Sequence, residues 1–249
     1  MLLIPGHRFG HPTVQYSRGE VLNEASWNLK GKQFYRHQRK SFRFLTLVEN
    51  GIHGQKLTKG LNTFEVFATN NYAVINRQST RKVWLNDPKD PLAIERAITA
   101  YTSDVGAAPE LVLLVLKVRS VEAYSRFKDV VDRTTGCHSI CMTERVFEGG
   151  IASCMRNIMM KANLKGAGSN HTIKDGIIQQ IMSDTLVLGA DVTHPSGSSI
   201  LGCPSIAAIV GSVDDHAGRF LGSMRLQSAA KKEVIPLETR IDPVADLDR

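Results

Sequence analysis

The sequence lacks the features that mark membrane-spanning, secreted and common nucleotide-binding proteins. It contains no apolar run of the roughly 18 residues that a membrane-spanning helix needs. Its first residues show no basic stretch followed by a cleavage site, so we expect no signal peptide. It has neither a Gly-x-Gly-x-x-Gly fingerprint nor a Walker loop, which argues against an ordinary dinucleotide or nucleoside triphosphate site.

Cysteine is also scarce, with four residues in a chain of 249. That number is too small for a disulfide scaffold and is typical of a reducing compartment. Cys137-His138-x-x-Cys141 has the spacing of half a zinc site, but no second Cys/His pair follows at the spacing of a zinc finger. Because the segment around them is apolar, we interpret both cysteines as buried thiols of a strand.

The net charge of +7 is concentrated at one end of the chain. Residues 1–43 hold eight basic and two acidic side chains, a net charge of +6, so the remainder is almost neutral. This stretch has many turn-forming residues and no sustained periodicity, and we expect residues 1–40 to be an extended linker. Contact with phosphates and simple solvation both explain such a basic segment.

From residue 42 onward, strand and helix patterns alternate. Residues 111–116 form a continuous apolar run, which is typical of a strand covered on both faces of a parallel sheet. Asp90-Pro91 has the residue types of a helix N-cap and first turn. This alternation predicts an α/β layer with a mainly parallel sheet. The expected strands are residues 42–48, 111–116 and 136–142, and the expected helices are residues 57–67, 90–101, 121–132 and 151–164.

The segment from Lys165 to His171 interrupts this pattern with two glycines and several polar turn residues. Such a composition favours a helix end and a boundary. Beyond it, residues 185–192, 205–213 and 220–226 have strand patterns joined by short, turn-rich connections. Short connections between adjacent strands favour an antiparallel meander, so we expect two units divided near residues 166–180.

Two pairs of side chains have the spacing of neighbours on a helix face. Tyr124 and Lys128 stand four residues apart on one expected helix, and Lys161 and Lys165 stand four apart near the end of another. One interpretation is that these are ordinary surface lysines, which the helix dipole favours near a C-terminus. The other is that both helices direct their side chains at one anion beyond the carboxyl ends of the parallel strands. Two lysines at this spacing repel each other, and a bound phosphate would relieve that repulsion.

Asp191 stands in an otherwise apolar strand pattern from Leu186 to Pro195. Burying a carboxylate costs on the order of several kcal/mol unless it is paired or binds a metal. Hard divalent ions such as Mg²⁺ select carboxylate oxygens, so Asp191 is a candidate metal ligand. The alternative is that Asp191 caps the turn at Thr193-His194-Pro195.

Three ordered segments of the sequence resemble eukaryotic Argonaute proteins. Gly189-Ala-Asp-Val-Thr-His-Pro195, followed by Pro204-Ser-Ile-Ala-Ala-Ile-Val-Gly-Ser212, resembles the start of the family's PIWI domain. The segment from Ile158 to Gly168 is similar to the end of the MID domain, and Trp27 to Phe34 is similar to the linker that precedes it. The resemblance covers roughly residues 20–235.

The resemblance implies an α/β fold in four parts. Residues 1–40 would be the linker, and residues 41–170 a Rossmann-like MID domain with a mainly parallel sheet. Residues 171–235 would be the incomplete first strands of an RNase H-like PIWI domain. Residues 236–249 form an atypical tail, because two prolines and four acids do not match the helix expected next.

For function, the resemblance implies binding of the 5′-phosphate of a small guide RNA in gene silencing. Tyr124 would stack on the first base, and Lys128, Lys161 and Lys165 would bind the phosphates. The strand residues Ser139 and Cys141 would supply neighbouring polar contacts. The expected nucleotide specificity loop consists of Lys117, Val118, Arg119, Ser120, Val121 and Glu122.

Two departures from the family pattern concern this site. Ile140 stands where the family commonly has Gln, so one phosphate donor is missing or is replaced by Ser139 or Thr143. The loop from Lys117 to Glu122 lacks the Pro-Gly sequence of the better-known animal proteins. A preference for one 5′ base is therefore not carried over.

The resemblance also implies a Mg²⁺-dependent slicer site in a complete PIWI domain. Asp191 matches the first metal ligand and Glu233 matches the region of a mobile glutamate, whereas the remaining ligands are expected beyond residue 249. Because these carboxylates do not position two ions, we expect this chain alone not to cleave RNA. The alternatives are that both residues are catalytic in a longer slicer, or that the chain binds a protein partner and its lysines are a solvated face.

The expected partners are a 5′-phosphorylated small guide RNA, a target RNA bound through the parent protein, and proteins of a silencing complex, with no membrane. Mg²⁺ is expected only in a slicing-competent parent, and the protein groups alone would bind the 5′-phosphate. The resemblance implies the cytoplasm, with entry into the nucleus also open.

Overall fold

The computed structural model describes residues 12–21, 28–37, 40–147, 151–174, 176–196, 199, 202–216 and 218–227. The chain divides into two compact units, Met1–Thr172 and Ile173–Arg249. Trp27, Glu233 and the tail from residue 236 lie outside the described residues, as do parts of the expected linker. None of the described helices is both long enough and apolar enough to cross a membrane.

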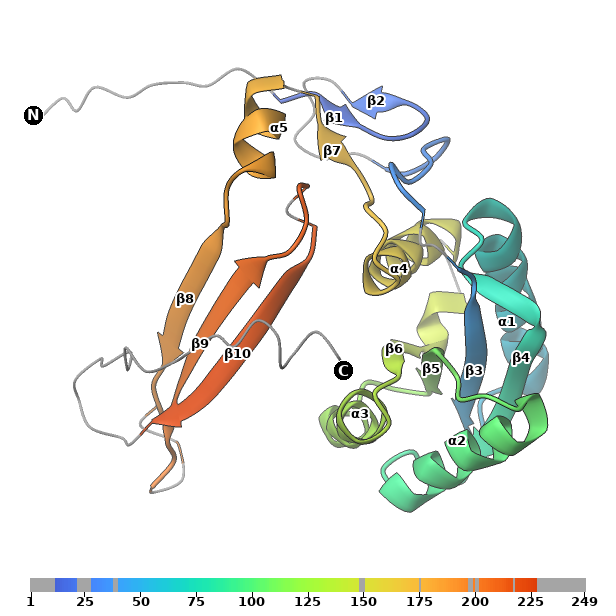
Figure 1. Cartoon of the computed structure of the whole chain (residues 1–249). Coiled ribbons are helices and arrows are strands. Elements are labelled where there is room, and N and C mark those ends of the chain that lie inside the picture. The colour runs from blue at the N-terminus through green and yellow to red at the C-terminus, as the bar shows by residue number, and fades with distance from the viewer. Residues whose placement is uncertain are drawn as a thin grey trace, which may run out of the picture. The chain divides into compact units, whose positions relative to one another are not determined.

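The first unit contains a four-stranded, fully parallel sheet with the strand order β4-β3-β5-β6. All six residues of the central strand β5 are buried, because helices cover the sheet on both sides (Figure 1). The mainly parallel sheet predicted from the continuous apolar run is therefore confirmed. The strands are β3 (Phe42–Glu49), β4 (Ile75–Leu85), β5 (Leu111–Leu116) and β6 (His138–Thr143).

Two hydrophobic cores fill the two faces of this sheet. Helices α1 (Gly54–Val66) and α4 (Ile151–Lys165) pack on one face, against Leu111, Leu113 and Val115 of β5. Helices α2 (Pro91–Val105) and α3 (Val121–Lys128) pack on the other face, and alternate residues of β5 point toward them. This alternation follows from the two-residue period of a strand. The β5 residues of the second core are Val112, Leu114 and Leu116.

The helix expected over residues 121–132 has a different hydrogen-bonding pattern in its second half. α-Helical bonding ends at Lys128, and a π-helical turn, η2 (Asp129–Thr134), follows it. A second π-turn, η1 (Phe67–Asn71), follows α1, and a 3₁₀ turn, η3 (Glu144–Phe147), follows β6. Single π-turns inside helices often occur at functional sites, and η2 carries Asp132 next to one of the candidate lysines.

The N-terminal segment is more ordered than the expected extended linker. Strands β1 (Val14–Gln15) and β2 (Glu20–Val21) pair antiparallel, and β1 also borders β7 (Thr172–Ile173) in a sheet of order β2-β1-β7. The Tyr16 and Phe34 side chains are buried, and Phe34 belongs to the core on the α1 side of the main sheet. Sequence periodicity missed these strands because each has only two residues.

The second unit consists of helix α5 (Gly176–Ser183) and a three-stranded sheet. Its strands β8 (Leu188–Thr193), β9 (Ser205–Ser212) and β10 (Phe220–Gln227) follow one another, and both neighbouring pairs are antiparallel. The antiparallel meander predicted from the short connections is therefore confirmed. Helix α5 and strand β4 were not predicted from the sequence.

The start of α2 confirms the predicted cap. The Asp90 side chain accepts a hydrogen bond from the backbone N–H of Leu92 at 2.9 Å, and Pro91 occupies the first helical position. Gly106 ends the helix in the left-handed conformation with a φ of 78°. Both ends of α2 are thus fixed by local residues, which sets its length along the sheet.

We expect Asp90→Ala to lower the free energy of unfolding by about 1 kcal/mol, because the first turn of α2 loses its cap. Asp90→Asn is the matched control, since Asn caps helices as well as Asp but carries no charge for Arg96, whose guanidinium lies 3.5 Å from the Asp90 carboxylate. Urea unfolding followed by circular dichroism measures both variants. Equal losses in the two would show that the charge matters and the cap does not.

Candidate functional site

The candidate phosphate-binding residues come from two helices that flank the edge strand β6. Tyr124 and Lys128 lie on α3, and Lys161 and Lys165 lie in the last turns of α4. These helices cover opposite faces of the sheet, and β6 is its last strand (Figure 1). The lysines can therefore come near one another only around the edge of the sheet.

Lys128 forms hydrogen bonds, an ion pair and an aromatic contact with its neighbours. Its ammonium donates to the Ser139 carbonyl oxygen at 3.2 Å and to the Ser139 hydroxyl, and it forms an ion pair with Asp132 at 3.1 Å. The ammonium also lies 5.8 Å from the ring centroid of Tyr124, whose side chain is 48% exposed. The i, i+4 relation between Tyr124 and Lys128 thus becomes a direct contact.

Asp132 was not among the residues singled out from the sequence. It stands four residues after Lys128, which is a spacing that signals a helical ion pair. The Asp132 carboxylate also acts on Lys165, where it favours the protonated amine. One acid therefore compensates part of the positive charge that two helices contribute.

The pKa of Lys165 responds to charges from both helices. Its pKa is lowered chiefly by burial, and then by the positive charges of Lys128 on α3 and Lys161 on α4. Asp132 opposes this shift. The structure therefore brings all three predicted lysines into one electrostatic environment, which we call the lysine cluster (Lys128, Lys161 and Lys165). Their role toward an RNA 5′ end stays a prediction.

The C-terminal end of α4 is held in place by a tight turn. Ala167 takes a left-handed conformation with a φ of 63°, and a Cβ on the next residue, Gly168, would overlap the Asn163 side chain. The Asn163 amide donates to the carbonyl oxygen of Arg36 at 3.1 Å and to the Asn170 side chain at 3.0 Å. The glycine is thus required by a close approach, and the turn fixes the helix end that carries Lys161 and Lys165.

The two predicted polar residues of β6, Ser139 and Cys141, differ in the contacts that their side chains can make. Ser139 is buried, and its hydroxyl is engaged by Lys128. Burial raises the pKa of the Cys141 thiol to about 11, although the Lys128 charge acts in the opposite direction. Cys141 is therefore a neutral thiol at physiological pH, suited to a weak contact and not to nucleophilic chemistry.

Ile140, which stands where the family commonly has Gln, points to the opposite side of the sheet from its two neighbours. Its side chain is buried in the core that α1 and α4 form with β5. Ser139 and Cys141 face α3, so their side chains are on the face that carries Lys128. At the Lys128 ammonium, the β6 groups that accept hydrogen bonds belong to Ser139.

The predicted nucleotide specificity loop connects β5 to α3, and both of its ends are anchored. The backbone N–H of Lys117 donates to the Glu49 carboxylate at 2.7 Å. Ser120 is the N-cap of α3, and its hydroxyl accepts a hydrogen bond from the N–H of Ala123 at 3.2 Å. The position of the loop is therefore fixed at each end by a hydrogen bond from a backbone N–H to a side chain.

Apolar side chains are exposed both in the loop and directly after it. Val118 of the loop is 71% exposed, and Val121, the first residue of α3, is 73% exposed. The Glu122 carboxylate forms an ion pair with Lys89 at 3.0 Å, which ties the first turn of α3 to the segment before α2. Val121 and Glu122 belong to α3 and not to the loop itself. The selection of a 5′ base by these residues and by Arg119 stays a prediction.

Asp191 lies on β8, opposite Ala208 of β9, and its side chain is exposed. The expected burial of this carboxylate is therefore wrong: Asp191 is solvated by water, and the cost of burial does not point to a metal ion. No group of three or more His, Cys, Asp or Glu side chains suited to a metal occurs among the described residues. Because Mg²⁺ keeps several water ligands and binds through only one or two carboxylates, the role of Asp191 as a metal ligand in a complete PIWI domain stays a prediction. Glu233 lies outside the described residues.

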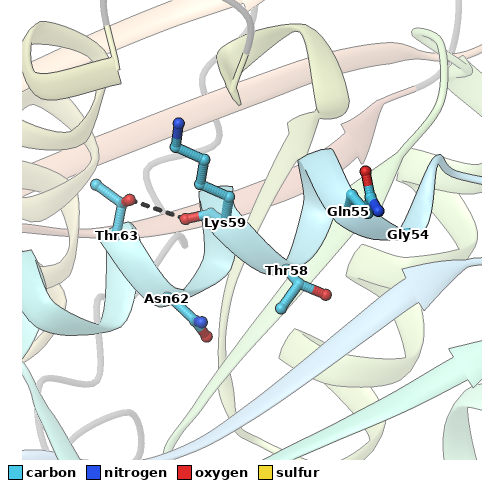
Figure 2. Close-up of a pocket in the computed structure, with 6 residues that line it drawn as sticks. All are labelled: Gly54, Gln55, Thr58, Lys59, Asn62 and Thr63. Carbon is cyan, nitrogen blue, oxygen red and sulfur yellow. Dashed lines mark hydrogen bonds between the residues drawn. The ribbon is translucent and has the colours of Figure 1, made fainter.

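A shallow hollow of about 610 Å³ lies along one face of α1. Its lining offers amides, hydroxyls and one ammonium, and the Thr63 hydroxyl donates to the Lys59 carbonyl oxygen at 2.8 Å (Figure 2). None of these described lining groups is an acid, a thiol or an imidazole, so we assign no catalytic role to the hollow. Its lining residues are Gly54, Gln55, Thr58, Lys59, Asn62 and Thr63.

Comparison with known proteins defines the class. The model of the Piwi domain matches residues 111–244, which is more than half of the chain. This match includes β5, α3, β6 and α4, the elements that carry the lysine cluster, and nine residues of the atypical tail. The chain therefore belongs to the Piwi domain family.

Argonaute proteins are among the relatives of this chain. Protein argonaute-2 of Drosophila melanogaster is 25% identical over 227 residues, which are 90% of this chain and 18% of that protein. Protein argonaute 12 of Oryza sativa subsp. japonica is 33% identical over 143 residues, which are 55% of this chain and 14% of that protein. The chain thus spans less than a fifth of the length of these curated relatives.

Solved structures agree with the fold. The C-terminal lobe of a budding yeast Argonaute has a TM-score of 0.73 and 23% identity, over 91% of this chain and 50% of that one. The MID-PIWI domains of N. crassa QDE-2 have a TM-score of 0.62 and 25% identity, over 78% of this chain and 54% of that one. The predicted Rossmann-like MID sheet followed by the first PIWI strands is therefore confirmed as the fold, whereas the residue boundaries of the domains stay predictions.

We expect Cys141 to resist alkylation in the native chain at pH 8, because a thiol with a pKa of about 11 is only about one part in a thousand thiolate there. Cys203 is exposed and should be modified first. Iodoacetamide labelling followed by mass spectrometry of the peptides measures both rates, with the urea-unfolded chain as reference. Similar rates for Cys141 and Cys203 in the native chain would contradict the burial.

We expect Lys165→Met to raise the free energy of unfolding at pH 7 by a few tenths to about 1 kcal/mol, because the folded chain no longer holds a partly buried ammonium near two others. The lowered pKa of Lys165 means that the unfolded chain binds more protons just below the ordinary lysine pKa. The stability of the unmodified chain should therefore rise as pH rises through that window, and the variant should lack this rise.

Urea unfolding between pH 7 and 10.5 tests this expectation. The exposed Lys161, replaced by Met, is the matched control and should change the pH dependence less. A Lys165→Met variant that is less stable, with the same pH dependence as the unmodified chain, would show that Lys165 is not destabilised in the folded state.

Proposed function

We propose that the chain binds the 5′-phosphorylated end of a small guide RNA at the lysine cluster, as part of an RNA-guided silencing protein. The observation that carries this proposal is that Lys128 of α3, bonded to Ser139 of the edge strand β6, and the end of α4 with Lys161 and Lys165 flank the same edge of one parallel sheet, with charges that lower the pKa of Lys165. Holding three ammonium groups together is unfavourable in the free chain, and it becomes favourable when an anion binds among them.

The ion pair between Lys128 and Asp132 suggests how the site is occupied. A terminal phosphate carries more negative charge than one carboxylate and has three oxygens that accept charge-assisted hydrogen bonds. It can therefore replace Asp132 as the partner of Lys128 and extend to Lys161 and Lys165. The Ser139 contacts hold the Lys128 ammonium in place before the phosphate arrives.

The first nucleotide has an aromatic surface beside this cluster. The Tyr124 ring is about half exposed, with the Lys128 ammonium 5.8 Å from its centroid. A base stacked on an aromatic ring gains about 1–3 kcal/mol with little dependence on its identity. The ring and the cluster together favour a 5′ nucleotide over a free anion.

The similar structures support this class of ligand. A Kluyveromyces polysporus Argonaute with a TM-score of 0.72 was solved with a guide RNA, and a Clostridium butyricum Argonaute with a TM-score of 0.59 was solved with a guide DNA and a target DNA. By extension, a target RNA and the proteins of a silencing complex are partners of the longer protein. The cytoplasm is proposed as the compartment, with four free thiols in its support.

We expect a 5′-phosphorylated oligoribonucleotide to bind more tightly than the same oligonucleotide with a 5′-hydroxyl, and Lys128→Ala to reduce that difference by about tenfold to a hundredfold. The reduction follows because the phosphate loses a charge-assisted hydrogen bond. Fluorescence anisotropy at fixed salt measures the four affinities.

Lys59→Ala is the matched control, since Lys59 is exposed on α1 and belongs to another surface. It should leave the preference for the 5′-phosphate unchanged. Equal affinities for the two oligonucleotides, insensitive to Lys128→Ala, would refute the proposal and would instead favour a solvated lysine face.

A further inference from the structure

A positively charged pocket lies in the first unit, where the N-terminal segment packs against η1 and α4. It has a volume of about 200 Å³, and Arg18, Lys32 and Arg156 contribute its charges. Phe67 and Tyr72 form its apolar wall. None of these residues belongs to the lysine cluster, so the pocket is a separate feature of the surface.

The charge of this pocket is not compensated within the part of the chain that the structure describes. Its lining contains three cationic side chains and no carboxylate. None of Arg18, Lys32 and Arg156 forms an ion pair with a described acidic residue. Three cations in a lining that holds no carboxylate raise the local potential, which attracts an anion.

Two of the three cations are held in position by contacts that leave their charge intact. The Lys32 ammonium donates to the backbone carbonyl oxygen of Glu20 at 2.7 Å, and its side chain lies against Gly19, which has a φ of 93°. The Arg156 guanidinium lies 5.8 Å from the ring centroid of Phe67. A carbonyl oxygen and an aromatic face orient a cation but do not neutralise it.

Tyr72 contributes both a buried aromatic ring and a polar hydroxyl to the pocket wall. The side chain is buried, and burial raises the pKa of its phenol, while the Arg156 charge and a hydrogen bond with Arg156 act in the opposite direction. The guanidinium is therefore fixed by a ring above and a hydroxyl beside it. Such a fixed guanidinium binds phosphate with little loss of side-chain entropy.

The size of the pocket limits the ligand. Sites for drug-sized molecules and cofactors measure about 300–1,000 Å³, so about 200 Å³ suits a single small group and not a whole nucleotide. Arginine and lysine together favour tetrahedral oxyanions, because the guanidinium fork matches two phosphate oxygens.

We propose that Arg18, Lys32 and Arg156 form a second site that binds one phosphate group, either a phosphodiester of an RNA chain or free phosphate. The site is independent of the proposed 5′-end binding, because it uses different residues and requires no terminal phosphate.

The test uses the full chain in which Lys128→Ala and Lys165→Met remove the lysine cluster. Isothermal titration calorimetry with inorganic phosphate, at an ionic strength kept constant with chloride, measures the affinity of the second site for phosphate. We expect this background to retain phosphate binding and expect Arg156→Gln or Lys32→Gln to weaken it about tenfold. Lys30→Gln is the matched control, since Lys30 is exposed in the same segment but does not line the pocket.

A 5′-hydroxyl oligoribonucleotide that competes with phosphate would identify the RNA backbone as the source, and failure to compete would identify free phosphate. Both results support a phosphate site. Loss of all phosphate binding in the cluster-deficient background would overturn it, as would binding that neither Arg156→Gln nor Lys32→Gln changes. Lys32 is only partly buried, so Lys32→Gln keeps the test valid if Arg156→Gln fails to fold.

Discussion

Burial of β5 on both faces is the constraint on which the rest of the first unit depends. Six consecutive apolar residues require a cover on each side of the sheet, and two helices on each face supply it. One helix from each face, α3 and α4, flanks the edge strand β6, and their lysines approach one another there. The hydrophobic effect thus holds together charges that electrostatics alone would separate. The arrangement that stabilises the sheet is the same arrangement that prepares a site for an anion.

Among the described residues, the Asp132 carboxylate offsets part of this unfavourable charge. Asp132, carried by a π-turn, pairs with Lys128 and also favours the protonated form of Lys165. A bound phosphate would compensate the lysine charges in place of Asp132, with more negative charge and more acceptor atoms. Under the proposed function, affinity for RNA would depend on a few converging groups more than on the overall charge of +7. Binding of that kind has a weaker salt dependence than binding through a broad basic surface.

The N-terminal segment carries most of the net charge, and its described part is built into the fold. Phe34 lies in the main core, and the backbone of Arg36 accepts a hydrogen bond from Asn163 near the end of α4. Arg18 and Lys32 face Arg156 of the same helix across a small pocket. Helix α4 therefore joins two positively charged regions, with Arg156 at one and Lys161 and Lys165 at the other. The N-terminal segment packs on α4, and both proposed phosphate sites use side chains of the same helix.

The sequence by itself determined the features that depend on neighbours a few residues apart: the two-sided burial of Leu111–Leu116, the Asp90 cap, the meander of the second unit and the pairing of Tyr124 with Lys128. Strand β4 escaped prediction because its mixed burial pattern has no clear period. The exposure of Asp191, the π-turn that places Asp132 and the pocket around Arg156 were decided only by the tertiary structure. Burial and charge proximity depend on which distant segments pack together. Local spacing can place two lysines on one helix face, but only the packing of α3 and α4 on one sheet brings the cluster together.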